Sequence, residues 1–306
     1  MFDIIVVGGG PAGLTAALYG ARAGKSVLLI EKYMYGGQIT YSHKVENYPA
    51  CPDISGVDFA DNLYRQATSF GVKTKSDEVI SAIVEGHVKS VATASGKTYE
   101  AKTIIFAVGA YARRLGLPGE DALIGAGISF CAVCDGGFYR GRDVAVCGGG
   151  NTALGEAIYL SDLCKTVYLI HRRDTFRADD ALVQTLATKK NVVRVMESRI
   201  TSLSQTDGML SGITVTNNDG TTKDLAVDGL FEAVGYLPDF APFKTILPLT
   251  ADGYGDAGED CTTTIPGVFV AGDCRRKAVR QLTTAVSDGA VSALAACDFI
   301  DKQAHA

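Results

Sequence analysis

The stretch Asp3-Ile-Ile-Val-Val-Gly8-Gly9-Gly10-Pro11-Ala12-Gly13 decides the fold of the first part of the chain. Its apolar run, 3–7, predicts a short buried strand, and the glycines lead into a helix predicted over 11–23. A second apolar strand is predicted over 26–30, which completes a β-α-β unit. In such a unit, G-x-G-x-x-G permits a tight turn, a close approach of the backbone to a pyrophosphate and close packing of helix on strand. We therefore expect a nucleotide phosphate at the start of this helix, held by Gly8, Gly10, Pro11, Ala12 and Gly13.

An acidic residue ends the second strand of this unit. Glu31 follows Gly8 by twenty-three residues, and a carboxylate at this position can accept hydrogen bonds from the ribose of an adenine nucleotide. The alternative is a glycine-rich turn without a ligand. The combination of strand, helix, second strand and acid favours the nucleotide site.

The second half of the chain repeats this pattern. A strand is predicted over 143–147, a glycine turn at 148–150, a helix over 153–163 and a strand over 166–170. The stretches 103–109 and 229–235 close the two halves alike. Such self-similarity predicts two nucleotide-binding domains of related fold. The second nucleotide is expected at Gly148, Gly150, Asn151, Thr152 and Ala153.

The two halves differ at the residue that follows the second strand. At the position of Glu31, the second copy has His171, which begins the run His171-Arg172-Arg173, with Arg177 one turn further. A carboxylate would repel a 2′-phosphate, whereas guanidinium groups can bind one. The second domain is therefore predicted to prefer NADPH over NADH, the alternative being a solvated basic face.

The remaining segments are β-like runs and a C-terminal tail. Three runs within 72–108 and three within 193–234, separated by turn residues, predict a small antiparallel meander in each domain. A strand over 268–271 and a helix over 281–300 make a tail too small to fold alone, so we expect it to complete the first sheet. The predicted fold class is α/β, with two Rossmann-like, three-layer (ββα) nucleotide-binding domains. The first is discontinuous, 1–115 with 244–306, and the second is 116–243.

The stretch Cys131-Ala-Val-Cys134-Asp135 lies between the two glycine turns. Two thiols separated by two residues can close into a disulfide, and a CxxC at a helix start favours the reactive thiolate. Zinc is the alternative, which is disfavoured because no second CxxC or paired His follows at ligand spacing. The other six of the eight cysteines lack such a context and are interpreted as packing thiols in a reducing cytoplasm.

Composition and charge limit the class of protein. The chain of 306 residues is long enough for two domains, and its net charge of −5 gives no overall basic field for nucleic acid or an anionic membrane. The start, Met1-Phe2-Asp3, has no basic region or cleavage-type site, and the apolar stretches are interrupted well short of a membrane span. We expect a cytoplasmic protein that binds neither nucleic acid nor membrane.

These features resemble the low-molecular-weight NADPH-dependent thioredoxin reductases, class II pyridine nucleotide-disulfide oxidoreductases, over essentially the whole chain. The resemblance is carried by the residues quoted above and by four further stretches: Gly36-Gly37-Gln38, Glu46-Asn47-Tyr48-Pro49, Gly272-Asp273 and Arg280-Gln281. It implies FAD in the first domain, with Gly37, Gln38 and Asn47 near the flavin, Gly272 and Asp273 at the ribitol, and Arg280 and Gln281 beside the isoalloxazine ring. It also implies NADPH in the second domain, and a homodimer whose domains rotate during turnover.

The resemblance further implies a reaction. Hydride passes from NADPH to FAD, and the reduced flavin then reduces the Cys131–Cys134 disulfide. Asp135 is the expected proton donor or acceptor for the thiol that leaves the flavin. The resulting dithiol reduces thioredoxin or a thioredoxin-like protein through a mixed disulfide. The alternatives are a related flavoenzyme supplied by ferredoxin or reacting with oxygen, and a nucleotide-binding sensor without catalysis. The arginines disfavour the first alternative, and the retained dithiol disfavours the second.

Four features depart from the pattern that the resemblance implies or lack a clear place in it. Gly155 stands early in the second glycine-turn helix, where an acid is expected, and Gly137 stands where an aromatic residue is common. Glu232 lies within an otherwise apolar strand. The basic run Arg275-Arg276-Lys277 is interpreted as a solvated loop, the alternative being a surface that steers an acidic partner.

Overall fold

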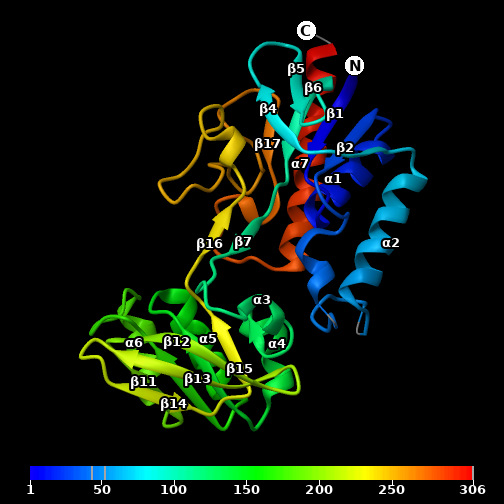
Figure 1. Ribbon diagram of the computed structural model, residues 1–306. Coiled ribbons are helices and arrows are strands. Elements are labelled where there is room, and N and C mark those ends of the chain that lie inside the picture. The colour runs from blue at the N-terminus through cyan, green and yellow to red at the C-terminus, as the bar shows by residue number, and fades with distance from the viewer. Residues whose placement is uncertain (43, 52, 305–306) are drawn as a thin grey trace. The chain divides into compact units, whose positions relative to one another are not determined.

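The chain divides into two compact units (Figure 1). In this computed structural model, which describes residues 1–42, 44–51 and 53–304, unit 1 comprises Met1–Tyr111 with Leu237–Ala306, and unit 2 comprises Ala112–Tyr236. These boundaries fall a few residues before the sequence-based ones at 115 and 243. Where the chain passes between the units, β7 (Ala110–Ala112) pairs with β16 (Tyr236–Pro238).

Unit 1 is built on a seven-stranded sheet in which β6 (Thr98–Phe106) is the central strand. The first half of β6 pairs antiparallel with β5 (Lys89–Thr93), and its second half pairs parallel with β17 (Val268–Val270). The predicted completion of the sheet by the C-terminal tail is therefore confirmed. The other strands are β1 (Phe2–Val7), β2 (Val27–Glu31), β3 (Lys73–Ser76) and β4 (Val79–Ile83).

The first predicted meander run in unit 1 is two strands. β3 pairs parallel with β2, so it extends the main sheet, while β4 pairs antiparallel with β5. The break falls at Asp77-Glu78, where the Asp77 N–H donates to the Glu31 carbonyl oxygen at 2.9 Å. The residues at this break are neither glycine nor proline, which explains why the sequence pattern read as continuous.

Two helices lie together on one face of the unit 1 sheet, as Figure 1 shows. They are α1 (Pro11–Arg22) and α7 (Leu282–Ala304). Their close approach depends on Gly289, because a Cβ there would lie 2.3 Å from the Ala12 carbonyl oxygen. The remaining helices of the unit are α2 (Gly56–Ser69) and the 3₁₀ turns η1 (Gly37–Tyr41), η3 (Ala241–Phe243) and η4 (Gly272–Cys274).

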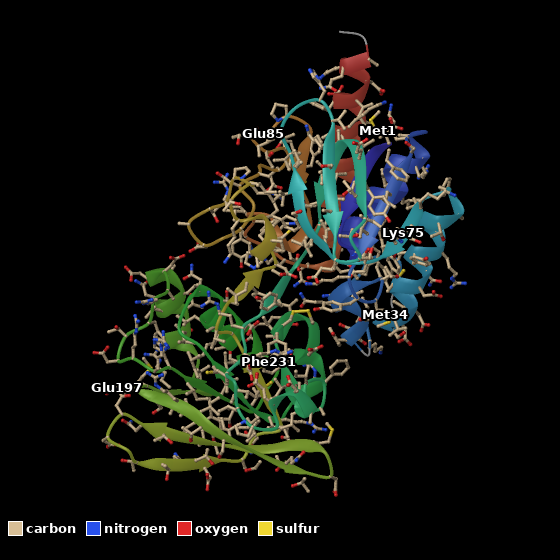
Figure 2. All side chains as sticks on the ribbon, turned by 45° about the horizontal axis from the view of Figure 1, so that its top comes forward. Met1, Met34, Lys75, Glu85, Glu197 and Phe231 are labelled. Carbon is tan, nitrogen blue, oxygen red and sulfur yellow. A yellow bond between two sulfur atoms is a disulfide. The ribbon has the colours of Figure 1, made fainter. Side chains whose placement is uncertain are left out.

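Unit 2 has the three layers expected from the sequence. Its parallel sheet has the order β11-β10-β9-β15-β8. The strands are β8 (Ile128–Ser129), β9 (Asp143–Cys147), β10 (Thr166–Ile170), β11 (Val192–Val195) and β15 (Gly229–Glu232). Successive residues of β15 point to opposite faces of the sheet. Phe231, labelled in Figure 2, packs in the core on the helix side, and Leu230 packs in the core on the meander side.

The outer layers of unit 2 cover these two cores. The helix layer consists of α5 (Asn151–Ser161) and α6 (Asp180–Thr188). The other layer is an antiparallel sheet of β12 (Ser198–Thr206), β13 (Met209–Asn217) and β14 (Thr222–Leu225). Short helices α3 (Glu120–Leu123), α4 (Ala132–Asp135) and η2 (Gly136–Tyr139) complete the unit. Within the residues described, no helix is long and apolar enough to cross a membrane.

Candidate active site

The glycine turn of unit 1 has a bare backbone at the start of α1. Gly8 has φ +104°, and a Cβ there would lie 2.4 Å from the Ala107 carbonyl oxygen. A Cβ at Gly13 would lie 1.8 Å from the Gly8 carbonyl oxygen, so helix and strand touch through backbone. Gly10, by contrast, faces open space, with its nearest neighbour at 3.9 Å. A pyrophosphate can therefore approach the N–H groups at this helix start.

The Glu31 side chain holds this turn in place by hydrogen bonds. Its carboxylate accepts hydrogen bonds from the Gly9 N–H at 2.6 Å and from the Tyr33 N–H at 2.8 Å, and the residue is only 8% exposed. The sequence analysis expected Glu31 to bind ribose, and that remains a prediction. The structure adds a positioning contact that ties the end of β2 to the phosphate turn.

Asp273 lies beside the same turn with an unsatisfied carboxylate. Its Oδ1 is buried, and no residue in the described part of the chain donates to it. Burial raises the pKa of Asp273, because the charged form loses hydration. The preceding Gly272 approaches Ala12 so closely that a Cβ would lie 2.8 Å away. A buried acceptor next to a phosphate turn fits the hydroxyl groups of a flavin ribitol, so the residues of unit 1 fit FAD.

The other predicted flavin residues are held by contacts within unit 1. The Gly36 N–H donates to the Gly9 carbonyl oxygen at 2.8 Å, which brings Gly37 next to Gly10. The Asn47 amide donates to the Gln281 side chain at 3.2 Å. Two further contacts fix the remaining side chains: Gln38 donates to the Ala110 carbonyl oxygen, and the Arg280 guanidinium lies 4.1 Å from the centroid of the Tyr254 ring.

The interpretation of Arg275-Arg276-Lys277 as a solvated loop is wrong for two of its three residues. Arg275 is 1% exposed, and the Lys277 side chain is 5% exposed. Both pair with the buried Asp288 of α7, at 2.9 Å from Arg275 Nε and 2.8 Å from Lys277 Nζ. Asp288 also accepts the Gly272 N–H at 2.9 Å. The basic run is therefore an internal ion cluster that fixes the residue preceding Asp273, and only Arg276 is exposed.

The glycine turn of unit 2 has the same close backbone contacts as that of unit 1, but His171 supports it in place of a glutamate. A Cβ at Gly148 would lie 2.4 Å from the Ala233 carbonyl oxygen, and one at Gly149 would lie 2.2 Å from the His171 ring. His171 is 8% exposed, and its Nε2 donates to the Thr175 carbonyl oxygen at 3.1 Å. Burial lowers the pKa of His171, so the ring is held neutral. His171 thus supports Gly149 as Glu31 supports Gly9.

Three arginines follow His171 around this turn. The Arg177 N–H donates to the Gly149 carbonyl oxygen at 2.7 Å, which holds the arginine loop against the glycines. Among the residues that the structure describes, no carboxylate forms an ion pair with Arg172, Arg173 or Arg177. Guanidinium groups without internal partners are available for a phosphate. These residues therefore fit the phosphates of NADPH.

The first three residues of α5 differ in burial and in hydrogen bonding. Asn151 exchanges hydrogen bonds with Asp179, donating from Nδ2 to Oδ2 at 2.9 Å and accepting the Asp179 N–H at 2.8 Å. Thr152 is exposed at the helix start, and Ala153 is buried beneath Gly148. The glycine turn is thus anchored to the loop before α6 as well as to His171.

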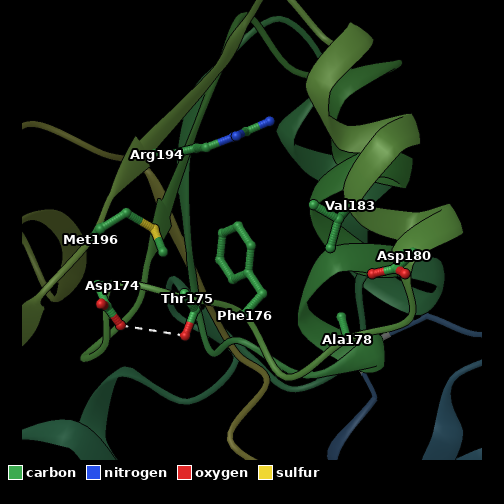
Figure 3. A pocket seen from close by; sticks show the side chains of 8 residues that line it. All are labelled: Asp174, Thr175, Phe176, Ala178, Asp180, Val183, Arg194 and Met196. Atoms are coloured by element: carbon green, nitrogen blue, oxygen red, sulfur yellow. Dashed lines mark hydrogen bonds between the residues drawn. The ribbon is translucent and has the colours of Figure 1, made fainter.

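A cavity that the sequence did not suggest opens beside the arginine loop. It has a volume of about 370 Å³. Figure 3 shows Phe176 in its centre, Arg194 and Met196 on one side, and Val183 with Asp180 on the other. Its lining comes from the loop before α6, from α6 itself and from the end of β11, so the cavity forms only when these neighbouring elements pack together.

The redox pair is formed in the structure. Cys131 and Cys134 are joined by a disulfide, with their Cα atoms 5.3 Å apart. Cys131 caps α4, and its Sγ accepts the Cys134 N–H at 3.2 Å. The sequence analysis missed Ser129, whose hydroxyl donates to Asp135 Oδ2 at 2.6 Å and accepts the Cys131 N–H at 3.1 Å. One buried hydroxyl therefore fixes both the acid and the first cysteine.

The structure places the three remaining departures in unit 2. A Cβ at Gly155 or Gly137 would meet nothing within 4 Å, so neither glycine is required by lack of space. Glu232 is 2% exposed, and both carboxylate oxygens are buried without a hydrogen-bond donor in the part of the chain described. Burial, together with the nearby Glu120 carboxyl, raises the pKa of Glu232 to about 8, so it is protonated at neutral pH.

A dithiol and two nucleotide turns define a nucleotide-dependent oxidoreductase that acts on disulfides. Residues 2–289 match the family described as pyridine nucleotide-disulphide oxidoreductase, and the chain belongs to this family. The thioredoxin reductase of Bacillus subtilis (strain 168) is 34% identical over 303 residues, covering 99% of this chain and 96% of the relative. That of Listeria monocytogenes serovar 1/2a is 37% identical, with 99% and 95% covered.

A solved structure supports the same placement. The crystal structure of thioredoxin reductase from Streptococcus pyogenes MGAS5005 is similar, with a TM-score of 0.92 and 38% identity, and 99% of each chain is covered. The resemblance and the fold class predicted from the sequence are therefore confirmed. The residue-by-residue assignment of the sites remains a prediction.

Proposed function

We propose that this protein is an NADPH-dependent, FAD-containing thioredoxin-disulfide reductase. The observation that carries the proposal is the Cys131–Cys134 disulfide next to Asp135 in the same unit as the arginine-lined nucleotide turn. Relatives called thioredoxin reductase, which align over nearly their whole length, support it.

Unit 1 supplies the residues that would hold FAD. The Gly8–Gly13 turn and the start of α1 would bind the pyrophosphate, and Asp273 would accept hydrogen bonds from ribitol hydroxyls. Asn47, Gln281 and Arg280 would orient the ring system. Unit 2 would hold NADPH at Gly148–Ala153, with Arg172, Arg173 and Arg177 at the 2′-phosphate. When bound, the two groups supply a hydride donor and a two-electron relay to the disulfide.

The residues around the dithiol perform the exchange with the partner protein. A thiolate of the reduced pair attacks the partner's disulfide, and the second thiol then resolves the mixed disulfide, which closes Cys131–Cys134 again. Asp135 moves the proton that this exchange requires. Ser129 keeps the Asp135 carboxylate next to the pair through its 2.6 Å hydrogen bond.

We further propose thioredoxin or a thioredoxin-like protein as the partner, a homodimer as the working form and the cytoplasm as its location. The names of the relatives favour this partner. Six free cysteines favour the cytoplasm, because its reducing conditions keep thiols from forming disulfides.

Three measurements test the proposal: thioredoxin reduction by the wild type, the same assay with Cys134→Ser, and flavin absorbance under anaerobic NADPH. Purified enzyme should reduce thioredoxin with NADPH and much more slowly with NADH. Cys134→Ser should retain FAD and lose disulfide reduction. Thioredoxin reduction by Cys134→Ser at the wild-type rate would contradict the dithiol mechanism, and a flavin that stays oxidised under anaerobic NADPH would contradict the choice of electron donor.

A further inference from the structure

A carboxyl group on α5 lies against the inner side of the dithiol. Glu156 Oε1 accepts a hydrogen bond from the N–H of Ala132, the residue that follows Cys131, at 3.3 Å. Glu156 Oε2 is buried, and no donor to it exists among the residues described. α5 begins at the nucleotide turn and carries Glu156 one turn further along, so the helix connects that turn to the dithiol.

The Glu156 carboxyl takes no part in the ion pairs among the described residues of unit 2. In the described part of the chain, no Lys, Arg or His forms an ion pair with it. Burial raises its pKa to about 7, while the Ala132 N–H acts in the opposite direction. The titratable groups on the elements packed against α5 are Cys134 and Asp135 of α4 with the capping Cys131, Asp143 and Cys147 of β9, Tyr168 of β10, Asp180 of α6 and Arg194 of β11. The contact recorded for the Glu156 carboxyl itself is with the backbone between the two cysteines.

The charge at this place changes when the disulfide opens. Reduction takes up two electrons and at least one proton: the sulfur–sulfur bond breaks and leaves one thiol and one thiolate, or two thiols if a second proton is taken up. A thiolate on either cysteine would be next to Ala132 and hence near Glu156. Two anions in a poorly hydrated site repel each other, so the thiolate favours a protonated neighbour.

We propose that Glu156 is a positioning residue that links the redox state of the dithiol to a proton: its carboxyl takes up a proton when the disulfide is reduced and releases it when the disulfide closes. The inference rests on the proposed function, because it takes Cys131–Cys134 as the redox centre. Asp135 still serves the partner exchange, and Glu156 adjusts how readily the thiolate forms.

The test is a redox titration of the holoenzyme against dithiothreitol at fixed ratios, with thiols trapped by alkylation and counted by mass, from pH 5.5 to 8.5. Glu156→Gln keeps the oxygen that accepts the Ala132 N–H and removes the ionisable group. In the wild type we expect the equilibrium constant for reduction to fall with rising pH about tenfold more across this range than in Glu156→Gln, corresponding to a coupling of about one pKa unit. Asp121→Asn, an exposed acid on α3, makes the same charge change and should follow the wild type.

The outcomes separate this inference from the proposed function. If the wild-type disulfide is not reversibly reduced by dithiothreitol, the proposed function fails. If it is, and Glu156→Gln shows the wild-type pH profile, only the role of Glu156 fails. Should Glu156→Gln not fold, the reduced-minus-oxidised infrared spectrum of the wild type decides. A carboxylic acid band that gains intensity on reduction near pH 7 supports the inference, and its absence overturns it.

Discussion

Asp288→Asn should destabilise unit 1 strongly, because Asp288 is the buried carboxylate that pairs with both buried cations, Arg275 and Lys277. Among the residues that the structure describes, the one other carboxylate within hydrogen-bond distance of either cation is the exposed Glu259, near Arg275. Removing one partner of a buried ion pair costs about 3–5 kcal/mol, since the remaining charge is left without compensation. For a unit of this size the loss corresponds to a fall in Tm on the order of 10 °C. The Gly272 N–H also loses its charged acceptor, so we expect weaker retention of FAD.

The effect should depend on pH in a defined direction. Burial opposes ionisation of Asp288, but the hydrogen bonds from Arg275 and Lys277 prevail and hold its pKa below the ordinary value of 3.8. A group with a depressed folded-state pKa contributes stability above its unfolded pKa and loses it as pH falls toward the folded value. The difference in the free energy of unfolding between the wild type and Asp288→Asn should therefore be largest at pH 7 and decrease below about pH 4.

The assay is urea unfolding at pH 7 and at pH 3.5–4, followed by FAD release and circular dichroism. Asp256→Asn is the matched control, because Asp256 pairs with the exposed Arg276 at 3.3 Å. A surface pair of this kind contributes about 0–1 kcal/mol. Equal small losses in both variants would refute the account of Arg275 and Lys277 as an internal cluster.

Three further predictions concern the turns and the dithiol. Gly8→Ala should lose FAD, because its Cβ would lie 2.4 Å from the Ala107 carbonyl oxygen. FAD absorbance per chain measures this loss. Gly24→Ala is the control for backbone strain alone, because Gly24 also has a positive φ but lies in open space. Arg173→Gln should raise the KM for NADPH about tenfold or more and leave that for NADH unchanged, since a charged phosphate contact contributes about 1.5–3 kcal/mol; a parallel rise for both nucleotides would argue against a 2′-phosphate site. Ser129→Ala should lower the rate of thioredoxin reduction while leaving NADPH-driven flavin bleaching intact, as stopped-flow absorbance can show; an unchanged rate would mean that the Asp135 hydrogen bond is dispensable.

The sequence predicted the features that depend on local spacing. In each half of the chain, the first strand, the glycine turn and the residue after the second strand (Glu31 or His171) lie within one short stretch, 3–31 or 143–171. The sequence also predicted that 268–271 completes the first sheet, because a tail that small has no other way to bury its strand. The repeat made the second domain recognisable from the first.

The features that the sequence did not predict depend on contacts between separate elements of the fold. Arg275 and Lys277 look like surface residues until α7 brings Asp288 to them. Glu156 reads as one more polar residue of an amphipathic helix, although its carboxyl lies behind the dithiol. The split between β3 and β4 falls at Asp77-Glu78, without glycine or proline, where the Asp77 N–H donates to the Glu31 carbonyl oxygen. For Arg275, Lys277 and Glu156 the physical cause is burial, which a charged residue type in the sequence argues against.

The central claim is that electrons from NADPH reach the Cys131–Cys134 disulfide through a bound flavin. An anaerobic titration with NADPH, followed by flavin absorbance and by alkylation of new thiols, tests it directly. The wild type should consume two equivalents per chain, one for each two-electron acceptor, and gain two thiols that Cys134→Ser does not gain. Uptake of a single equivalent by both proteins, with the disulfide still closed in the wild type, would contradict the claim.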